Sequence, residues 1–166
     1  EGAYDVRVGA LVDLWGFGPG GIIEVPPAQD EIADLMSRVG QANLRLDVQN
    51  RSILKQSDLS VDVSSLAKGY AVDRVAEWLS AQGVRRYMVE VGGEMRLSGL
   101  SGRGDPWRIA IEEPKISERS IAITLSLTDV AIATSGDYRN YFEANGRRYS
   151  HSIDPRTGYP VTHDLV

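Results

Sequence analysis

Between residues 87 and 134 the sequence is divided into short segments that suit β-strands, and this division constrains the fold more than any other feature. Most of these segments contain β-branched residues, and Gly, Pro or Asp lie at or near their ends, where they interrupt strands and favour turns. The segments are too short and too regularly interrupted for helices. We therefore predict strands over residues 87–91, 95–98, 107–111, 120–127 and 130–134.

Two segments that precede these strands carry apolar residues at helical spacing. The first helix is predicted over residues 29–39, after a Pro-Pro pair, with Gly40 as the residue that stops it. The second is predicted from about residue 65 to residue 82, with Gly83 directly after it. Its expected apolar face consists of Leu66, Tyr70, Ala71, Val75, Trp78 and Leu79.

Two hairpins complete the prediction. Alternating apolar residues over 44–48, followed by a polar turn and Ile53, indicate the first. Asn145-Gly146 lies between residues 141–143 and 148–150, and both turn residues tolerate the positive φ of a type I′ turn. We predict an α+β fold, a single domain over residues 1–166 with a mixed or antiparallel sheet and packed helices.

Composition excludes several classes of function. The net charge of −5 leaves no extended basic surface, so nucleic acid is not an expected partner. The longest apolar stretches fall far short of the ~18 residues that a membrane span needs. The chain has no Cys, which excludes disulfides, thiolate nucleophiles and Cys-based zinc sites.

Gly16, Gly18 and Gly21 have the spacing of a dinucleotide-binding fingerprint, but their context does not fit one. That fingerprint needs a helix directly after the glycines to hold a pyrophosphate, whereas Pro19 and an extended segment follow here. A Gly-rich turn is the better interpretation.

The segment from Asp62 to Asp73 joins a strand to the second helix and has two interpretations. In the structural one, Ser64 or Ser65 caps the helix, Asp62 favours its positive end and Lys68 is solvated. In the functional one, the N–H groups of the helix start and Lys68 receive a diphosphate, while carbonyls and Asp62 serve a metal or a ring nitrogen. The residues alone leave both open.

Other polar segments are less decisive. Val91-Gly92-Gly93-Glu94 reads as a bulge or turn, although adjacent glycines also let a ligand approach the backbone. Residues 133–138 read as a strand end and turn. His151 directly follows a predicted strand beside the Asp154-Pro155 turn and is a candidate acid/base, while His163 is a weaker one. A triad of Ser135, Asp137 and a His is set aside, because no nucleophile-elbow sequence is present.

Taken together, the segments resemble the ApbE flavin-transferase family over the whole chain. The opening, from Ala3-Tyr4-Asp5 to Pro19, is similar to "D-x-x-V-G-P-L-V-x-L-W-G-F-G-P", with Ala10 in place of the proline after Val-Gly. Residues 62–73 resemble "D-L-x-x-x-A-K-G-Y-A-x-D". The remaining matches are residues 91–94 to "x-G-G-E", 134–141 to "T-S-G-x-Y-R-N-Y" and 151–158 to "H-x-I-D-P-x-T-G".

The resemblance implies a fold related to the T-fold and a set of site residues, which we expect to face one cleft. Ala3, Tyr4, Asp5, Asp62 and Lys68 would line the FAD site, with Asp62 contacting the flavin, and Ile153 would pack on it. Ser65 occupies a magnesium-ligand position, often served by the backbone carbonyl. The candidate catalytic acid/base is His151, or Asp62 acting through water. The family's other metal ligands lie in an "A-D-A-x-x-T" motif that these residues lack.

The resemblance also implies an activity, the Mg²⁺-dependent transfer of FMN from FAD to a threonine of an acceptor protein, with release of AMP. The acceptor would be a redox or respiratory protein. The enzyme would be lipid-anchored on the periplasmic side of the bacterial inner membrane. Two alternatives stay open, namely FAD hydrolysis to FMN and AMP, and flavin binding without catalysis. We expect the chain to be truncated at both ends and to expose apolar surface where further residues dock.

Overall fold

The computed structural model describes residues 2–41, 44–55, 59–114, 120–136 and 140–162. All strand pairs in these residues are antiparallel. Contacts group the chain into two compact units, and each is described by itself below. The first unit comprises Glu1–Asp62 and Arg139–Leu165, and the second comprises Val63–Tyr138 with Val166. The sequence offers no composition change at these boundaries, and the assignment of one domain to residues 1–166 stays a prediction.

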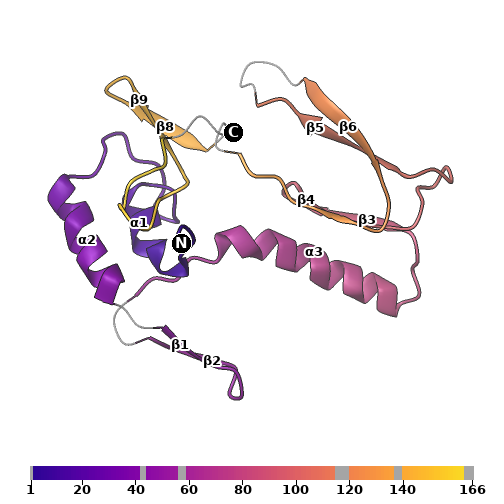
Figure 1. Ribbon diagram of the computed structural model, residues 1–166, viewed down its shortest axis with the longest axis horizontal. Helices are drawn as coiled ribbons and strands as arrows, with labels where there is room; N and C mark the ends of the chain where they lie inside the picture. Colours follow the sequence, from indigo (N-terminus) through magenta and orange to yellow (C-terminus); the bar gives the residue numbers. More distant parts are fainter. Residues whose placement is uncertain (1, 42–43, 56–58, 115–119, 137–139, 163–166) are drawn as a thin grey trace. The chain divides into compact units, whose positions relative to one another are not determined.

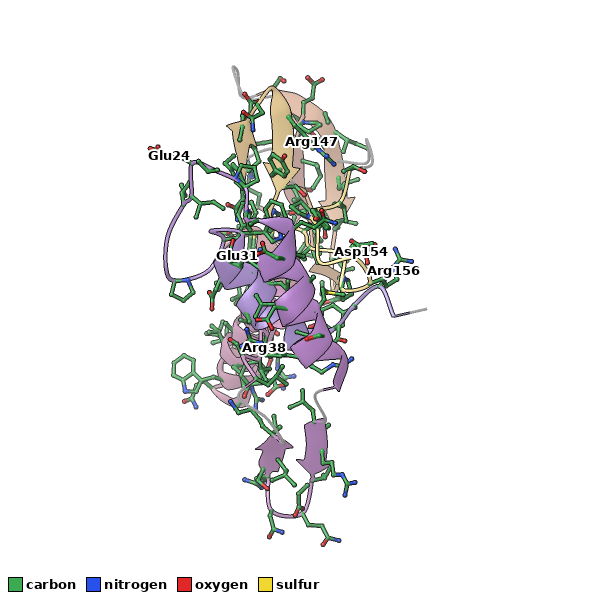
Figure 2. All side chains as sticks on the ribbon, turned by 90° about the vertical axis from the view of Figure 1, so that its left-hand side faces the viewer. Glu24, Glu31, Arg38, Arg147, Asp154 and Arg156 are labelled. Atoms are coloured by element: carbon green, nitrogen blue, oxygen red, sulfur yellow. The ribbon has the colours of Figure 1, made fainter. Side chains whose placement is uncertain are left out.

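The first unit contains short helices and two hairpins (Figure 1). Asn145 and Gly146 have φ of 52° and 71° in the turn of the second hairpin, as the type I′ prediction requires. Acidic residues lie in the first turn of α2 and Arg38 lies in its last turn (Figure 2). Both placements are favourable, because the helix dipole is positive at the N-terminus and negative at the C-terminus. The elements are η1 (Val6–Val8), α1 (Gly9–Leu14), α2 (Gln29–Gln41), β1 (Leu44–Asp47), β2 (Ser52–Lys55), β8 (Tyr141–Ala144) and β9 (Arg147–Ser150).

The core of the first unit forms around Trp15, whose side chain is 1% exposed. Its ring stacks on Tyr149, with the centroids 5.3 Å apart, and Tyr149 stacks on Phe142 at 5.0 Å. Leu11, one helical turn before Trp15, is fully buried. Ile32, from α2, joins the same cluster. Segments from both ends of the sequence therefore share one hydrophobic core.

The second unit places one long helix along a small sheet (Figure 1). The sheet has the strand order β3-β4-β7, and β5 pairs with β6 in a separate hairpin. The elements are α3 (Ser64–Ala81), β3 (Tyr87–Val91), β4 (Glu94–Ser98), β5 (Trp107–Glu112), β6 (Ile121–Leu127) and β7 (Ala131–Ile132).

The face of α3 that packs on the sheet matches the predicted one only in part, with Leu79 packed there as expected. Val72 and Ala76 are buried, with 2% and 1% exposure, and they contact Val89 of β3. Tyr70 and Trp78, which we assigned to the buried face, are 67% and 62% exposed. The apolar residues of α3 form two adjacent stripes, and their spacing alone does not decide which stripe packs on the sheet.

The α+β prediction is confirmed, and most predicted elements are present with small differences at their ends. Helix α2 continues through Gly40 to Gln41, so Gly40 does not stop it. Strand β7 is shorter than predicted. The prediction missed α1, although Leu11 and Trp15 have the helical i, i+4 spacing of its buried face. In the part of the chain that the structure describes, no helix has the length and apolar character of a membrane span.

Candidate functional site

The residues assigned to a site by sequence are divided between the two units. Ser65 and Lys68 belong to the second unit, in the first two turns of α3. The prediction that all of these residues line one cleft stays a prediction. Those in the first unit are Ala3, Tyr4, Asp5, Asp62, His151 and Ile153.

Asp62 is brought beside the opening of the chain. Its backbone N–H donates to the carbonyl of Val6 at 2.7 Å, directly after Ala3, Tyr4 and Asp5. The same segment approaches Gly9 so closely that a Cβ there would lie 2.9 Å from a backbone atom of Ser60. Glycine is therefore required at this start of α1. The first unit joins two of the predicted site segments, which are far apart in sequence.

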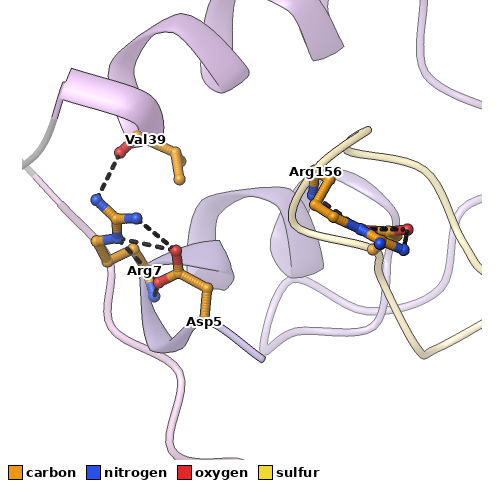
Figure 3. A network of polar contacts seen from close by, with 5 residues as sticks. Asp5, Arg7, Val39 and Arg156 are labelled. Atoms are coloured by element: carbon orange, nitrogen blue, oxygen red, sulfur yellow. Dashed lines mark hydrogen bonds and ion pairs between the residues drawn. The ribbon is translucent and has the colours of Figure 1, made fainter. Parts of the chain in front are cut away.

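Asp5 is held by Arg7, a residue that the sequence analysis did not single out. The Asp5 carboxylate accepts from the backbone N–H of Arg7 at 2.9 Å and from its guanidinium at 2.6 to 3.0 Å. Arg7 also donates to the carbonyl of Val39 at the end of α2 (Figure 3). Hydrogen bonds from the Arg7 side chain hold the pKa of the Asp5 carboxyl below its ordinary value. Asp5 thus caps η1 as an anion, and Arg7 links this cap to α2.

His151 directly follows β9, as predicted, and is oriented by the backbone. The backbone N–H of His151 donates to the backbone carbonyl of Asn140 at 3.1 Å, and the ring nitrogen Nδ1 lies 3.2 Å from the same oxygen. Its ring meets Phe17 edge-on, with the centroids 6.3 Å apart. A proton on Nδ1 would give this carbonyl a second donor and leave the lone pair on Nε2, which is the form that a general base needs.

The loop after β9 is a closed turn built on Asp154. The Asp154 carboxylate accepts from the backbone N–H of Arg156 and from its guanidinium at 2.6 to 3.2 Å (Figure 2). These hydrogen bonds lower the pKa of the Asp154 carboxyl to about 2. Ile153 forms an isolated bridge with Pro160 and packs against the core of the first unit. The predicted Asp-Pro turn is confirmed, and the packing of Ile153 on a flavin stays a prediction.

Trp15 anchors this loop, a role that no sequence signal revealed. The indole Nε1–H of Trp15 donates to the carbonyl of Gly158 at 2.8 Å in a buried environment. Gly158 has a φ of 77° and lies against α2, where a Cβ would come within 2.9 Å of Ile32 and of Met36. The loop that begins at His151 is therefore fixed at its far end by a hydrogen bond and by close packing.

Lys68 contacts the segment between β3 and β4 and is also partly solvated, since its side chain is 44% exposed. Its ammonium donates to the carbonyl of Gly92 at 3.2 Å and lies 3.4 Å from the Glu94 carboxylate. The cap expectation is wrong, because Val63 occupies the N-cap of α3 and Ser64 and Ser65 are its first helical residues. The N-cap residue Val63 makes no side-chain capping hydrogen bond. The carbonyl of Val63 accepts from the N–H groups of Leu66 and Ala67.

The donor set for Mg²⁺ is only partly present in the described residues. Mg²⁺ prefers near-octahedral oxygen coordination and usually takes one or two protein carboxylates. Ser65 offers an oxygen at the second residue of α3. Among the residues described here, no group of three or more His, Cys, Asp or Glu side chains could hold a metal ion. Ser65 fits one ligand position, but these residues by themselves do not fit a complete magnesium site.

The Gly-rich segment is a turn, as predicted. No helix follows Gly16 to Gly21 until α2 begins at Gln29, so the dinucleotide fingerprint is excluded. Ala10, where the resemblance has proline, is the second residue of α1, a position in a first helical turn that proline also tolerates. Asp137 of the discarded triad and His163 lie outside the described residues.

The chain matches known proteins over its whole length. The ApbE family profile matches residues 1–166. The chain is 50% identical to the FAD:protein FMN transferase of Vibrio cholerae and 41% identical to that of Escherichia coli K12. All of this chain is covered in both comparisons, with 49% and 48% of the relatives. The chain thus spans about half the length of the curated relatives it matches.

Solved structures agree with the sequence comparisons. The flavin transferase ApbE from Vibrio cholerae superposes with a TM-score of 0.80 at 45% identity, over 96% of this chain and 50% of that one. The apo form of the Pseudomonas stutzeri flavinyl transferase ApbE gives a TM-score of 0.79 at 43% identity, over 97% of this chain and 49% of that one. The motifs, the α+β fold and the whole-chain match lead to one conclusion: the chain belongs to the ApbE family.

Proposed function

We propose that this chain contributes to an enzyme that transfers FMN from FAD to a threonine hydroxyl of an acceptor protein and releases AMP. The observation that carries the proposal is the match of the entire chain, at 50% identity, to a relative named FAD:protein FMN transferase. Since the chain spans about half of that relative, the activity is proposed for the full-length protein.

The reaction breaks the diphosphate of FAD. The threonine oxygen forms a bond to the phosphorus of the FMN part, the bond from that phosphorus to the bridging oxygen breaks, and AMP leaves. The hydroxyl proton passes to a base. We assign this proton to Nε2 of His151, because the Asn140 carbonyl occupies the Nδ1 side of the ring. The alternative base is Asp62, acting through a water molecule.

We assign FAD binding to the predicted site residues whose contacts are described above. Lys68 would neutralise the diphosphate as a point charge, since its ammonium already lies in a defined place. Asp62 would contact the flavin beside Ala3, Tyr4 and Asp5, which the Asp62–Val6 hydrogen bond supports. Ile153 would pack on the ring system.

A magnesium ion is part of the proposal, with Ser65 as one ligand. It would supply positive charge at the diphosphate. The described residues do not provide the other protein ligands, so these are assigned to other residues of the full-length protein.

For partners and location we propose an exported redox or respiratory acceptor protein. The place of action would be the periplasmic side of the bacterial inner membrane, with a lipid anchor on the full-length enzyme. The bacterial relatives and the absence of Cys are compatible with this proposal. The net charge of −5 supports a partner other than nucleic acid.

The deciding experiment incubates the full-length protein with FAD, Mg²⁺ and an acceptor carrying the target threonine, followed by mass spectrometry of the acceptor. We expect the acceptor to gain the mass of the FMN group, with one AMP released per modification. Release of AMP with an unmodified acceptor would favour FAD hydrolysis instead. FAD that stays intact under saturating Mg²⁺ would favour a flavin-binding protein without catalysis.

A further inference from the structure

The turn between β3 and β4 consists of two glycines in left-handed conformations. Gly92 and Gly93 have φ of 57° and 92°, and Val91 pairs with Glu94 across them. These signs of φ are those of a type I′ turn, which accounts for glycine at both positions. The N–H of Gly93 also donates to the Glu90 carboxylate at 2.7 Å, which fixes the turn.

The turn also receives the side chain of Lys68 from α3. A Cβ added to Gly92 would lie 2.9 Å from Cδ of Lys68, so the lysine stem occupies the space that a side chain would need. Beyond this contact, the ammonium reaches the Gly92 carbonyl at 3.2 Å and the Glu94 carboxylate at 3.4 Å. The stem and the ammonium are thus held by the same few residues.

The contacts with Gly92 and Glu94 restrict the rotamers of the flexible Lys68 side chain before any ligand binds. An unrestrained lysine loses rotamer entropy when a ligand orders it. The same contacts restrict the rotamers open to Lys68, while its side chain stays 44% exposed, compared with 15% for Glu94. An ammonium has three N–H donors, and the Gly92 carbonyl accepts from one of them, while Glu94 lies within ion-pair distance.

We propose that Gly92 is a positioning residue that presets the Lys68 ammonium for the diphosphate of the flavin substrate, because its lack of a side chain admits the lysine stem. The inference rests on the function proposed above. The turn would raise affinity for FAD by lowering the entropy cost of binding.

Gly83 provides a matched control, since it also has a positive φ, of 80°, and a Cβ there would meet nothing within 4 Å. Alanine at either glycine is strained by the left-handed backbone conformation. Only at Gly92 would the added methyl group displace the side chain of Lys68. Lys68 can yield at little cost, because the atom contacted belongs to a flexible side chain. Both variants should therefore fold.

The test measures FAD affinity by titration and stability by urea denaturation in the full-length protein and its variants. We expect Gly92→Ala and Gly83→Ala to lose similar stability. We expect Gly92→Ala to weaken FAD binding several-fold, approaching the roughly ten-fold or greater loss for Lys68→Ala, and Gly83→Ala to bind like the parent. In the Lys68→Ala background, Gly92→Ala should cause no further loss.

Three outcomes would overturn the inference, and they differ in what they say about function. If Lys68→Ala weakens FAD binding while Gly92→Ala does not, the positioning role is wrong and the proposed function stands. If Gly92→Ala weakens binding equally with and without Lys68, Gly92 acts on the ligand directly. If the parent protein binds no FAD, the proposed function fails and the inference falls with it.

Discussion

The indole N–H of Trp15 donates to the carbonyl of Gly158 at 2.8 Å, across 143 residues of sequence. This buried hydrogen bond connects the end of α1 to the loop that begins at His151. The two segments belong to different motifs of the family, and the bond shows that one supports the other. Trp15 thus acts on the candidate site through the backbone of the loop.

Replacing Trp15 by phenylalanine should show how much this hydrogen bond contributes to the free energy of unfolding. Trp15→Phe keeps an aromatic ring but leaves the buried Gly158 carbonyl without its donor, so we expect a loss of about 1–3 kcal/mol in the free energy of unfolding. Urea denaturation measures it. Trp107→Phe is the control, because the Trp107 indole donates to Ser98 over 3.3 Å at a half-buried position. An equal loss in both variants would contradict the anchoring role.

Gly158→Ala should destabilise the same loop from its other side. The substitution combines a φ of 77° with contacts below 3.0 Å to Ile32 and Met36, so we expect a loss of about 2–4 kcal/mol. Gly146→Ala has a similar φ of 71° and meets nothing within 4 Å, and about 1–2 kcal/mol is expected there. Thermal or urea unfolding compares the two. Equal losses of stability in the two variants would show that the contacts with Ile32 and Met36 of α2 add nothing to the cost of the Gly158 substitution.

His151→Ala should lower the rate of FMN transfer by roughly 10²–10⁴ and leave FAD affinity nearly unchanged, as expected for a general acid or base. Single-turnover kinetics and FAD titration of the full-length protein separate the two effects. Asn140→Ala is the matched control, since it retains the backbone carbonyl that orients the ring. Parallel losses in rate and affinity for His151→Ala would indicate a structural role.

Lys68→Ala should weaken FAD binding, and the difference from the parent should shrink as salt concentration rises. A lysine acts on a diphosphate mainly as a point charge, and salt screens such an interaction where it is exposed. FAD titration at several salt concentrations tests this. Lys55→Ala removes the same charge at β2, where Lys55 donates to the Leu59 carbonyl, and should leave FAD affinity unchanged. A salt-independent loss would point to a packing role for Lys68.

Acid should weaken the hydrogen bonds between Asp154 and Arg156, because it protonates the Asp154 carboxylate. The folded-state pKa of Asp154 is about 2 against an ordinary 3.8, so its contribution is complete above pH 3.8 and is lost as the pH falls toward 2. Asp154→Asn should therefore be less stable than the parent at pH 7, and the difference should narrow between pH 4 and pH 2. Urea denaturation across this range provides the measurement. A difference that is constant with pH would mean that the carboxylate charge does not contribute.

Much of the fold could be predicted, because its elements depend on near neighbours in the sequence. Glycine, proline and asparagine mark the turns, and apolar spacing marks α2 and α3. The turn at Asn145-Gly146 follows from two residues alone. Membership of the ApbE family was also visible in ordered motifs, and the whole-chain match confirms it.

Tertiary structure decided which partners those elements meet. The buried face of α3 contains Val72 and Ala76, which pack with Val89 of β3, although other apolar residues of the helix have a similar spacing. The partners of Trp15 and Lys68 lie 143 and 24 residues away in sequence. Local patterns carry no information about such contacts, since chain folding alone sets which distant backbone groups come within hydrogen-bonding distance. The sequence by itself therefore determined the elements and the family, and the packing decided how the candidate site residues are held.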